Sequence, residues 1–200
     1  MSNVEDPRTA VCGLRERKKQ QTRQALHEAA LRLVDEKGLD GTTVEQICED
    51  VDVSPRTFFN YFPSKAAAAL DLPDTGISPE GAAGFRAAEG ELVPVLCELI
   101  GASMDDAQQR RRMKALVQRR PELMPAFSQW MGSVREQYYD LARERAGDAE
   151  AMAAVALTLA ALGMIAHDGT TGGDRSGAAR LLEAVDQLVS ARAVRLSPAA

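Results

Sequence analysis

The chain has 200 residues, a formal net charge of −5 and an isoelectric point of about 5.2. A chain of this length can form one domain or two small ones, each with its own hydrophobic core. Ala, Leu, Glu and Arg are abundant, aromatic residues make up only 4%, and alternating β-branched runs are absent, so the composition predicts an all-α protein without a sheet.

Three cysteines, Cys12, Cys48 and Cys97, are widely spaced and have no histidine at metal-ligand spacing. This pattern argues against a disulfide framework or a zinc site, so no metal and no cofactor are expected. We interpret Cys48 and Cys97 as buried small hydrophobic residues, with a thiol redox sensor as the alternative. Reduced cysteines and the lack of a signal-peptide pattern predict a cytoplasmic protein.

The first predicted helix is basic and runs from about Arg15 to Gly38. Residues 1–14 lack helical periodicity and are predicted to form a disordered arm. Between residues 8 and 34 there are seven Lys or Arg against two Glu, although the chain as a whole is acidic. His27 has no evident partner and is interpreted as a packing or surface residue. The buried stripe is predicted to consist of Leu26, Ala29, Ala30, Leu33 and Val34, and the basic face of Arg15, Lys18, Lys19 and Arg23.

Residues 42–65 predict two short helices joined by a tight turn. Thr42 and Thr43 both precede the first helix, and each has Glu or Gln three residues later, so either can form a capping box. Ser54 is a favoured N-cap, Pro55 suits the first helical position, and the next proline ends the second helix after about two turns. This is the helix-turn-helix layout, whose second helix enters the DNA major groove, although the spacing fits an ordinary helical hairpin equally well.

Apolar spacing also predicts the inner face of this motif. In the first helix the apolar residues recur at i, i+3, i+4 and i+7, namely Val44, Ile47, Cys48 and Val51. Phe58 or Phe59, with Val53 and Phe62, is expected to anchor the second helix. The outward positions are then Arg56, Thr57 and Asn60, which can all hydrogen-bond to base edges or phosphates.

The stretch GLRERKKQQTRQALHEAALRLVDEKGLDGTTVEQICEDVDVSPRTFFNYFPSK resembles the DNA-binding domain of the TetR family of bacterial repressors. The matching features are the basic lead-in, Gly before Thr-Thr-Val, and the run Val-Ser-Pro-Arg-Thr-Phe-Phe-x-Tyr-Phe-x-x-Lys, over roughly residues 15 to 70. The chain departs from the family at Cys48, Asp52 and Ala66, where the family has mostly Ala, Gly and an acidic residue. Asp tolerates a left-handed turn, so we expect the motif to survive, whereas Glu49, Asp50 and Asp52 are expected to lower phosphate affinity.

The resemblance and the outward positions together predict the DNA contacts. Arg56 and Thr57 are expected to read bases, Arg56 through a bidentate contact with guanine. Thr43 and Tyr61 match family positions that contact phosphates, and Lys65 matches the basic residue after the motif. The basic face of the first helix is interpreted as a phosphate contact, with a solvated face as the alternative. The predicted DNA-binding residues are Lys19, Thr43, Ser54, Pro55, Arg56, Thr57, Asn60, Tyr61 and Lys65.

The remaining chain is predicted to form a helical body, giving about nine helices in total. The expected domains are a DNA-binding domain at 15–72 with the motif at about 43–62, a hinge or connector at 73–90, and a ligand-binding and dimerisation domain at 91–200. The body helices are expected at residues 91–104, 105–120, 121–146, 151–166 and 177–194.

The stretch AMAAVALTLAALGMIA at residues 151–166 is apolar almost all round and must be covered on every side. We interpret it as too short and too rich in Ala to span a bilayer. A central core helix in a monomer is one interpretation. We favour a dimer interface, because the resemblance implies a four-helix dimer bundle made by the last two helices of each subunit. The predicted interface residues are Val155, Leu159, Leu162, Leu181, Val185 and Leu188.

Methionines and other apolar residues of the body would suit an adaptable ligand cavity. The segment RMKALVQRRPELMPAFSQW also resembles a TetR subgroup, including mycofactocin-system regulators, whose body is described as binding acyl-CoA-like ligands. The predicted pocket residues are Leu96, Ile100, Met113, Leu116, Val117, Met124, Phe127, Trp130, Met131, Val155 and Leu159.

The function expected from these features is that of a homodimeric transcriptional repressor that binds a palindromic operator and is released by a small, hydrophobic or acyl-type ligand. No nucleophile motif, metal spacing or cofactor loop supports an enzyme. The alternative is a helical ligand-binding or adaptor protein that does not bind DNA.

Overall fold

The computed structural model describes residues 7–73, 75–102, 107–168 and 175–191. Within these ranges it contains ten α-helices, one short 3-10 helix and no strand, which confirms the all-α class, with one α-helix more than the nine expected. The elements are α1 (Pro7–Lys37), α2 (Val44–Val51), α3 (Pro55–Phe59), α4 (Lys65–Ala69), α5 (Pro79–Ala87), α6 (Leu92–Ala102), α7 (Ala107–Arg119), η1 (Pro121–Leu123), α8 (Met124–Arg143), α9 (Asp148–Asp168) and α10 (Gly177–Ala191).

The chain forms two compact units, each drawn from two segments of sequence. The first unit comprises Met1–Asp74 and Arg112–Trp130, and the second comprises Thr75–Arg111 and Met131–Ala200. We call them the N-terminal unit and the C-terminal unit.

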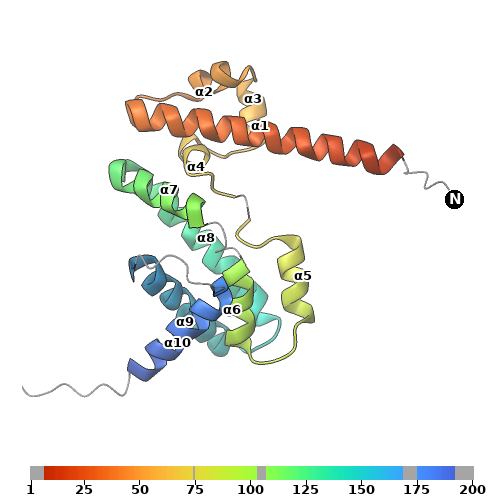
Figure 1. Ribbon diagram of the computed structural model, residues 1–200, viewed down its shortest axis with the longest axis vertical. Helices are drawn as coiled ribbons and strands as arrows, with labels where there is room; N and C mark the ends of the chain where they lie inside the picture. Colours follow the sequence, from red (N-terminus) through yellow and green to blue (C-terminus); the bar gives the residue numbers. More distant parts are fainter. Residues whose placement is uncertain (1–6, 74, 103–106, 169–174, 192–200) are drawn as a thin grey trace, which may run out of the picture. The chain divides into compact units, whose positions relative to one another are not determined.

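In the N-terminal unit, α2 and α4 pack against α1, and α3 follows α2 across a tight turn (Figure 1). All four alanines of α4 are buried, and their small side chains let α4 lie close to α1. His27 of α1 is also buried, with Nδ1 2.8 Å from the carbonyl oxygen of Ala68. Because a carbonyl oxygen only accepts, Nδ1 carries the hydrogen and donates it. His27 is therefore a packing residue with a backbone partner on α4.

The segment 112–130 belongs to the same unit, although the sequence led us to expect it in the body. Leu116 and Leu123 are buried in one core with the helices of the motif. Nε and Nη2 of Arg119 each lie 3.0 Å from a carboxylate oxygen of Asp35 near the end of α1. These hydrogen bonds hold the pKa of Asp35 below its usual value. The sequence could not indicate this packing, because the paired residues are 84 positions apart.

Helix α1 is longer than expected, since it begins at Pro7 rather than near Arg15. Proline is tolerated in a first helical turn, and residues 8–12 contain neither glycine nor proline. The disordered arm expected at 1–14 is thus replaced by helix from residue 7, and residues 1–6 lie outside the described residues. The N-terminal half of α1 extends beyond α2 and α4 (Figure 1), and every side chain from Arg15 to Gln21 is exposed.

In the C-terminal unit, α6, α9 and α10 pack on one another (Figure 1). The helices α6 and α10 approach closely at Gly101 of α6, where an added Cβ would lie 2.2 Å from the backbone nitrogen of Ala178 on α10. Only glycine leaves room for the backbone there. Cys97 is buried in the same unit, and its burial raises the pKa of the thiol to about 11.

Helix α5 occupies half of the predicted connector, residues 73–90. Ser78 caps it by accepting a hydrogen bond from Gly81 N at 3.0 Å, and Pro79 takes the first helical position. Buried Phe85 anchors the helix, and Arg86 pairs with Glu144. The glycines at 81 and 84 obscured this helix in the sequence, because glycine disfavours helix interiors.

One face of α9 is exposed in the single chain, although it is apolar. Met152 is 60% exposed and Met164 37%, and an added Cβ at Gly163 would meet no atom within 4 Å. By length and composition alone, Asp148–Ala166 is long and apolar enough to cross a membrane, with only 28% of it buried. The helix begins three residues before the apolar run 151–166 expected from the sequence, and the core helix of a soluble protein can meet the same criterion.

Candidate nucleic-acid interface

The first helix of the motif is fixed by a capping box. Thr43 Oγ1 accepts a hydrogen bond from Gln46 N at 3.2 Å, and Gln46 Oε1 accepts one from Thr43 N at 3.1 Å. Thr42 is buried and donates through Oγ1 to the carbonyl oxygen of Gly38 at 2.9 Å. The two capping pairs that the sequence left open are thus resolved in favour of Thr43 and Gln46.

The turn after α2 has the left-handed conformation expected at Asp52, with φ 55° and ψ 51°. Val53 N donates to Cys48 O at 3.0 Å, a bond that closes the end of α2 as in the Schellman motif. An aspartate therefore holds the position where the family mostly has glycine, and the motif keeps its geometry.

The second helix, α3, is short and held at its start. Ser54 Oγ accepts a hydrogen bond from Thr57 N at 3.1 Å and lies 2.9 Å from Thr57 Oγ1. Phe58 is fully buried, and its ring contacts that of buried Phe62. The sequence left either Phe58 or Phe59 as the anchor of this helix. The structure shows that it is Phe58, since Phe59 is 56% exposed.

The outward residues of α3 form one continuous strip, which we call the reading face. Its members are Pro55, Arg56, Phe59 and Asn60, and all four are exposed. They stand at positions i, i+1, i+4 and i+5, which share one side of a helix. Thr57 and Tyr61 are half-buried beside this strip. The sequence did not single out Phe59, although the i, i+4 spacing of Phe58 and Phe62 was a usable signal.

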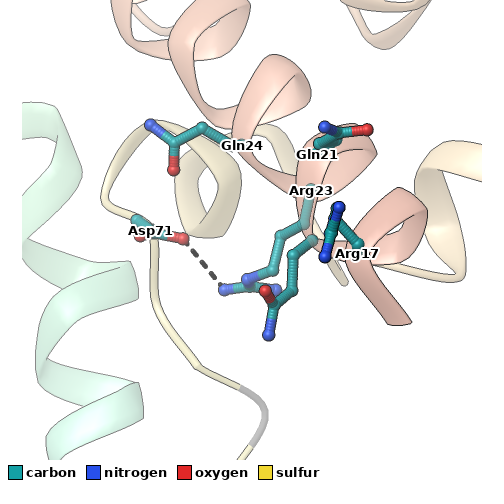
Figure 2. A pocket seen from close by; sticks show the side chains of 6 residues that line it. Arg17, Gln21, Arg23, Gln24 and Asp71 are labelled. Carbon is teal, nitrogen blue, oxygen red and sulfur yellow. Dashed lines mark hydrogen bonds and ion pairs between the residues drawn. The ribbon is translucent and has the colours of Figure 1, made fainter. Parts of the chain in front are cut away.

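Arg23 of α1 holds the end of the motif through hydrogen bonds from its guanidinium. Its guanidinium donates to Tyr61 O at 2.9 Å, to Leu72 O at 3.0 Å and to Asp71 Oδ1 at 3.0 Å. It also lies over the Phe62 ring, 4.1 Å from the centroid. Figure 2 shows the pair Arg23–Asp71, which lines an open pocket with Arg17, Gln20, Gln21 and Gln24. Arg23 thus fixes the end of the motif, whereas the sequence interpretation grouped it with the phosphate contacts.

The remaining predicted DNA contacts lie around the reading face or on α1. Lys65 is half-buried and donates through Nζ to Thr42 O at 2.8 Å, which ties the start of α4 to the start of α2. Lys19 is exposed on α1, four residues before Arg23. Of the three acidic residues near the turn, Asp50 pairs with Arg32 of α1 at 2.5 Å.

The predicted pocket and interface residues are distributed between the two units. Met113, Leu116, Val117, Phe127 and Trp130 belong to the core of the N-terminal unit or pack against it. Within the C-terminal unit, Leu96, Ile100 and Val155 are buried, Met131 and Leu159 are half-buried, and in the N-terminal unit Met124 is exposed. Of the predicted interface, Val155, Leu181 and Val185 are buried within their own unit, and Leu159, Leu162 and Leu188 are half-buried.

Comparisons with known proteins agree with the geometry of the motif. Residues 26–70 match the family model described as bacterial regulatory proteins, tetR family. The HTH-type transcriptional regulator TcmR of Streptomyces glaucescens is 36% identical over 126 residues, which cover 58% of this chain and 56% of that protein. The match therefore spans little more than half the length of this curated relative.

Among solved structures, NalD, the secondary repressor of the MexAB-OprM multidrug efflux pump in Pseudomonas aeruginosa, is 19% identical with a TM-score of 0.47, over 86% of this chain and 96% of that chain. The multidrug binding protein EbrR, complexed with imidazole, is 22% identical with a TM-score of 0.45, over 90% and 93%.

The capped pair α2–α3 and the outward polar strip on α3 define a helix-turn-helix protein. Over residues 26–70, which include α2, α3 and α4, the chain thus matches the TetR family of bacterial regulatory proteins.

Proposed function

We propose that the protein is a DNA-binding transcriptional repressor that binds a palindromic operator as a homodimer. The observation that carries this proposal is the reading face on α3, where Arg56, Phe59 and Asn60 are exposed while the cap at Ser54 and buried Phe58 fix the helix. A short helix with a fixed backbone and outward donors suits insertion into a major groove.

In this proposal the reading face contacts bases and the surrounding residues contact the phosphate backbone. Arg56 donates two hydrogen bonds to a guanine, and Thr57 and Asn60 complete the base contacts. The phosphate contacts come from Lys19, Thr43, Ser54, Tyr61 and Lys65, with Pro55 packed against the groove. Lys65 keeps two of its three N–H donors for a phosphate while the third holds Thr42.

The dimer is proposed to form through α9 and α10. The support for this is the exposed apolar strip around Met152, Gly163 and Met164 on α9, with Val189 59% exposed on α10. A soluble chain gains free energy by covering such a strip, and a second copy offers the same strip in return. Because Val155, Leu181 and Val185 are covered by their own unit, the proposed contact uses the exposed side of α9 instead.

Release from DNA is proposed to follow the binding of a small hydrophobic or acyl-type ligand. One support is the resemblance of residues 112–130 to regulators whose body is described as binding acyl-CoA-like ligands. The other is the apolar interior of the C-terminal unit at Leu96, Ile100 and Val155. A ligand releases DNA only if it prefers the conformation that does not fit the operator. We further propose a non-enzymatic, cytoplasmic protein.

A gel shift with the DNA upstream of its own coding sequence tests the proposal. We expect retardation of a specific fragment, and Arg56→Ala should weaken binding at one base pair by about 1–3 kcal/mol. Lys19→Gln should reduce the salt dependence of binding by about one counterion, whereas Arg17→Gln on the same helix is the matched control. No retardation at low salt would favour the alternative, a helical ligand-binding or adaptor protein. Long-chain acyl compounds that neither release the DNA nor raise the melting temperature would exclude that ligand class.

A further inference from the structure

Phe59 is the one large apolar residue with an exposed fraction above one half in the described part of the N-terminal unit. It does not serve the core, because Phe58 and Phe62 fill the inner side of α3 and both are fully buried. More than half of the surface of Phe59 stays in water, so the folded chain leaves much of its apolar area unburied. Its position therefore points to a contact outside the chain.

The ring stands in the middle of the reading face. Pro55 precedes it by four residues, Arg56 by three, and Asn60 follows it, so the three exposed residues surround it on one side of α3. The ring also meets the buried Phe58 ring edge to face, with centroids 5.3 Å apart and an angle of 90° between the planes. This contact limits the directions that the Phe59 side chain can adopt.

Resting on the function proposed above, we infer that Phe59 recognises the C5-methyl group of a thymine in the operator. In the major groove the thymine methyl is the apolar group among the base edges, and it contacts apolar side chains such as phenylalanine. Because Phe59 is three residues from Arg56, the two side chains reach neighbouring base pairs, so each half-site holds a thymine next to the guanine that Arg56 reads.

The test removes only the methyl group. A duplex enriched from a random-sequence library by the full-length protein is resynthesised with each thymine replaced in turn by deoxyuridine, which keeps its pairing with adenine. One position in each half-site should then raise the dissociation constant about fourfold, the value expected for one methyl group returned to water. All other replacements should leave the dissociation constant unchanged.

Protein variants assign this effect to Phe59. Phe59→Ala should bind the thymine and deoxyuridine duplexes with equal affinity, whereas Arg56→Ala should keep the fourfold ratio while losing its preference for guanine. Phe59→Leu keeps an apolar side chain and should retain part of the ratio, which separates loss of the methyl contact from loss of the fold.

Two results overturn the inference while leaving DNA binding intact. One is an enriched duplex in which no deoxyuridine replacement changes the affinity. The other is a Phe59→Ala variant that weakens binding equally on both duplexes, as a contact with sugar or phosphate would. If no duplex is enriched from the library at all, the proposed function fails first, and the inference fails with it.

Discussion

Different kinds of contact hold the helices together in the two compact units of this chain. In the N-terminal unit, polar side chains reach across helices to fix them: Arg23 to the end of α4, His27 to α4, Lys65 to the start of α2, and Arg119 to α1. In the C-terminal unit, α6 and α10 meet almost backbone to backbone at Gly101, and α9 leaves an apolar strip exposed. The first arrangement fixes the position of the short helix α3. The second leaves apolar surface of α9 uncovered in the single chain.

The largest effect is expected from closing the space at Gly101. In Gly101→Ala the new Cβ would lie 2.2 Å from a backbone nitrogen of α10, so the two helices must separate. We expect the free energy of unfolding to fall by about 3 kcal/mol, measured by far-UV circular dichroism in urea. Gly132→Ala on α8 is the control, since no atom lies within 4 Å of its added Cβ, and it should change stability by less than about 1 kcal/mol. Equal effects at both glycines would contradict close packing of α6 and α10.

Removing the hydrogen bonds of Arg23 should lower the free energy of unfolding of the N-terminal unit. Arg23→Met leaves two carbonyl groups and Asp71 without this donor, and we expect a loss of about 2–3 kcal/mol. The single tryptophan, Trp130, lies in this unit and donates to Pro73 O at 3.0 Å, so its fluorescence follows the unfolding of the N-terminal unit. Arg17 is exposed on the same helix, so Arg17→Met should change the midpoint of this unfolding transition little. If the unfolding midpoint of Arg23→Met equals that of the wild type, Arg23 does not stabilise the unit, and its original interpretation as a phosphate contact stands.

A charge on the exposed strip of α9 should affect association and spare the fold. Gly163→Arg places its side chain in open space in the single chain, so far-UV circular dichroism should stay unchanged. In the proposed dimer the charge becomes buried, and we expect the dimer dissociation constant to rise about thirtyfold, or about 2 kcal/mol. Sedimentation velocity measures this change, with Ser128→Arg on the exposed side of α8 as the control. A wild-type protein that sediments as a monomer would refute the proposed interface.

The buried thiol of Cys97 should make stability fall at high pH. Burial raises the pKa of this thiol from 9.0 to about 11, so the folded chain keeps its proton at pH values where the unfolded chain loses it. The stabilising contribution is complete below pH 9 and is lost as the pH rises towards 11, by about 1–2 kcal/mol. Unfolding in urea at pH 8, 9.5 and 11 should show this slope in the wild type and a smaller slope in Cys97→Ala. Equal slopes would mean that the thiol is ionised in the folded chain.

The smallest effect is expected at the turn between α2 and α3. Asp52 has φ 55°, a conformation that glycine adopts at lower cost, so Asp52→Gly should leave stability within about 1 kcal/mol of the wild type. Asp52→Asn keeps the tolerance for this conformation and removes the charge, so it should tighten DNA binding severalfold at low salt and less at high salt. If both variants bind DNA as the wild type does, the acidic turn does not limit the affinity.

Local patterns predicted the motif well, because caps and turns depend on residues close in sequence. Ser54 caps α3 and Pro55 occupies its first turn, and Asp52 takes the expected left-handed conformation. The same signals at Ser78 and Pro79 start α5, but the glycines that follow masked it. The start of α1 at Pro7 was also missed, because a short stretch without apolar periodicity can still continue a long helix.

The sequence by itself determined the helical class, the likeness of residues 15–70 to the TetR family and the positions of the two helices of the motif, since these depend on composition, capping and short-range spacing. Tertiary structure decided the rest. Only packing shows that Arg23 hydrogen-bonds to the end of the motif and that residues 112–130 join the N-terminal unit. Packing also decides that Phe58 is buried while Phe59 faces outward. Each of these outcomes depends on partners brought together from distant positions, and no local pattern encodes which partner a side chain will meet.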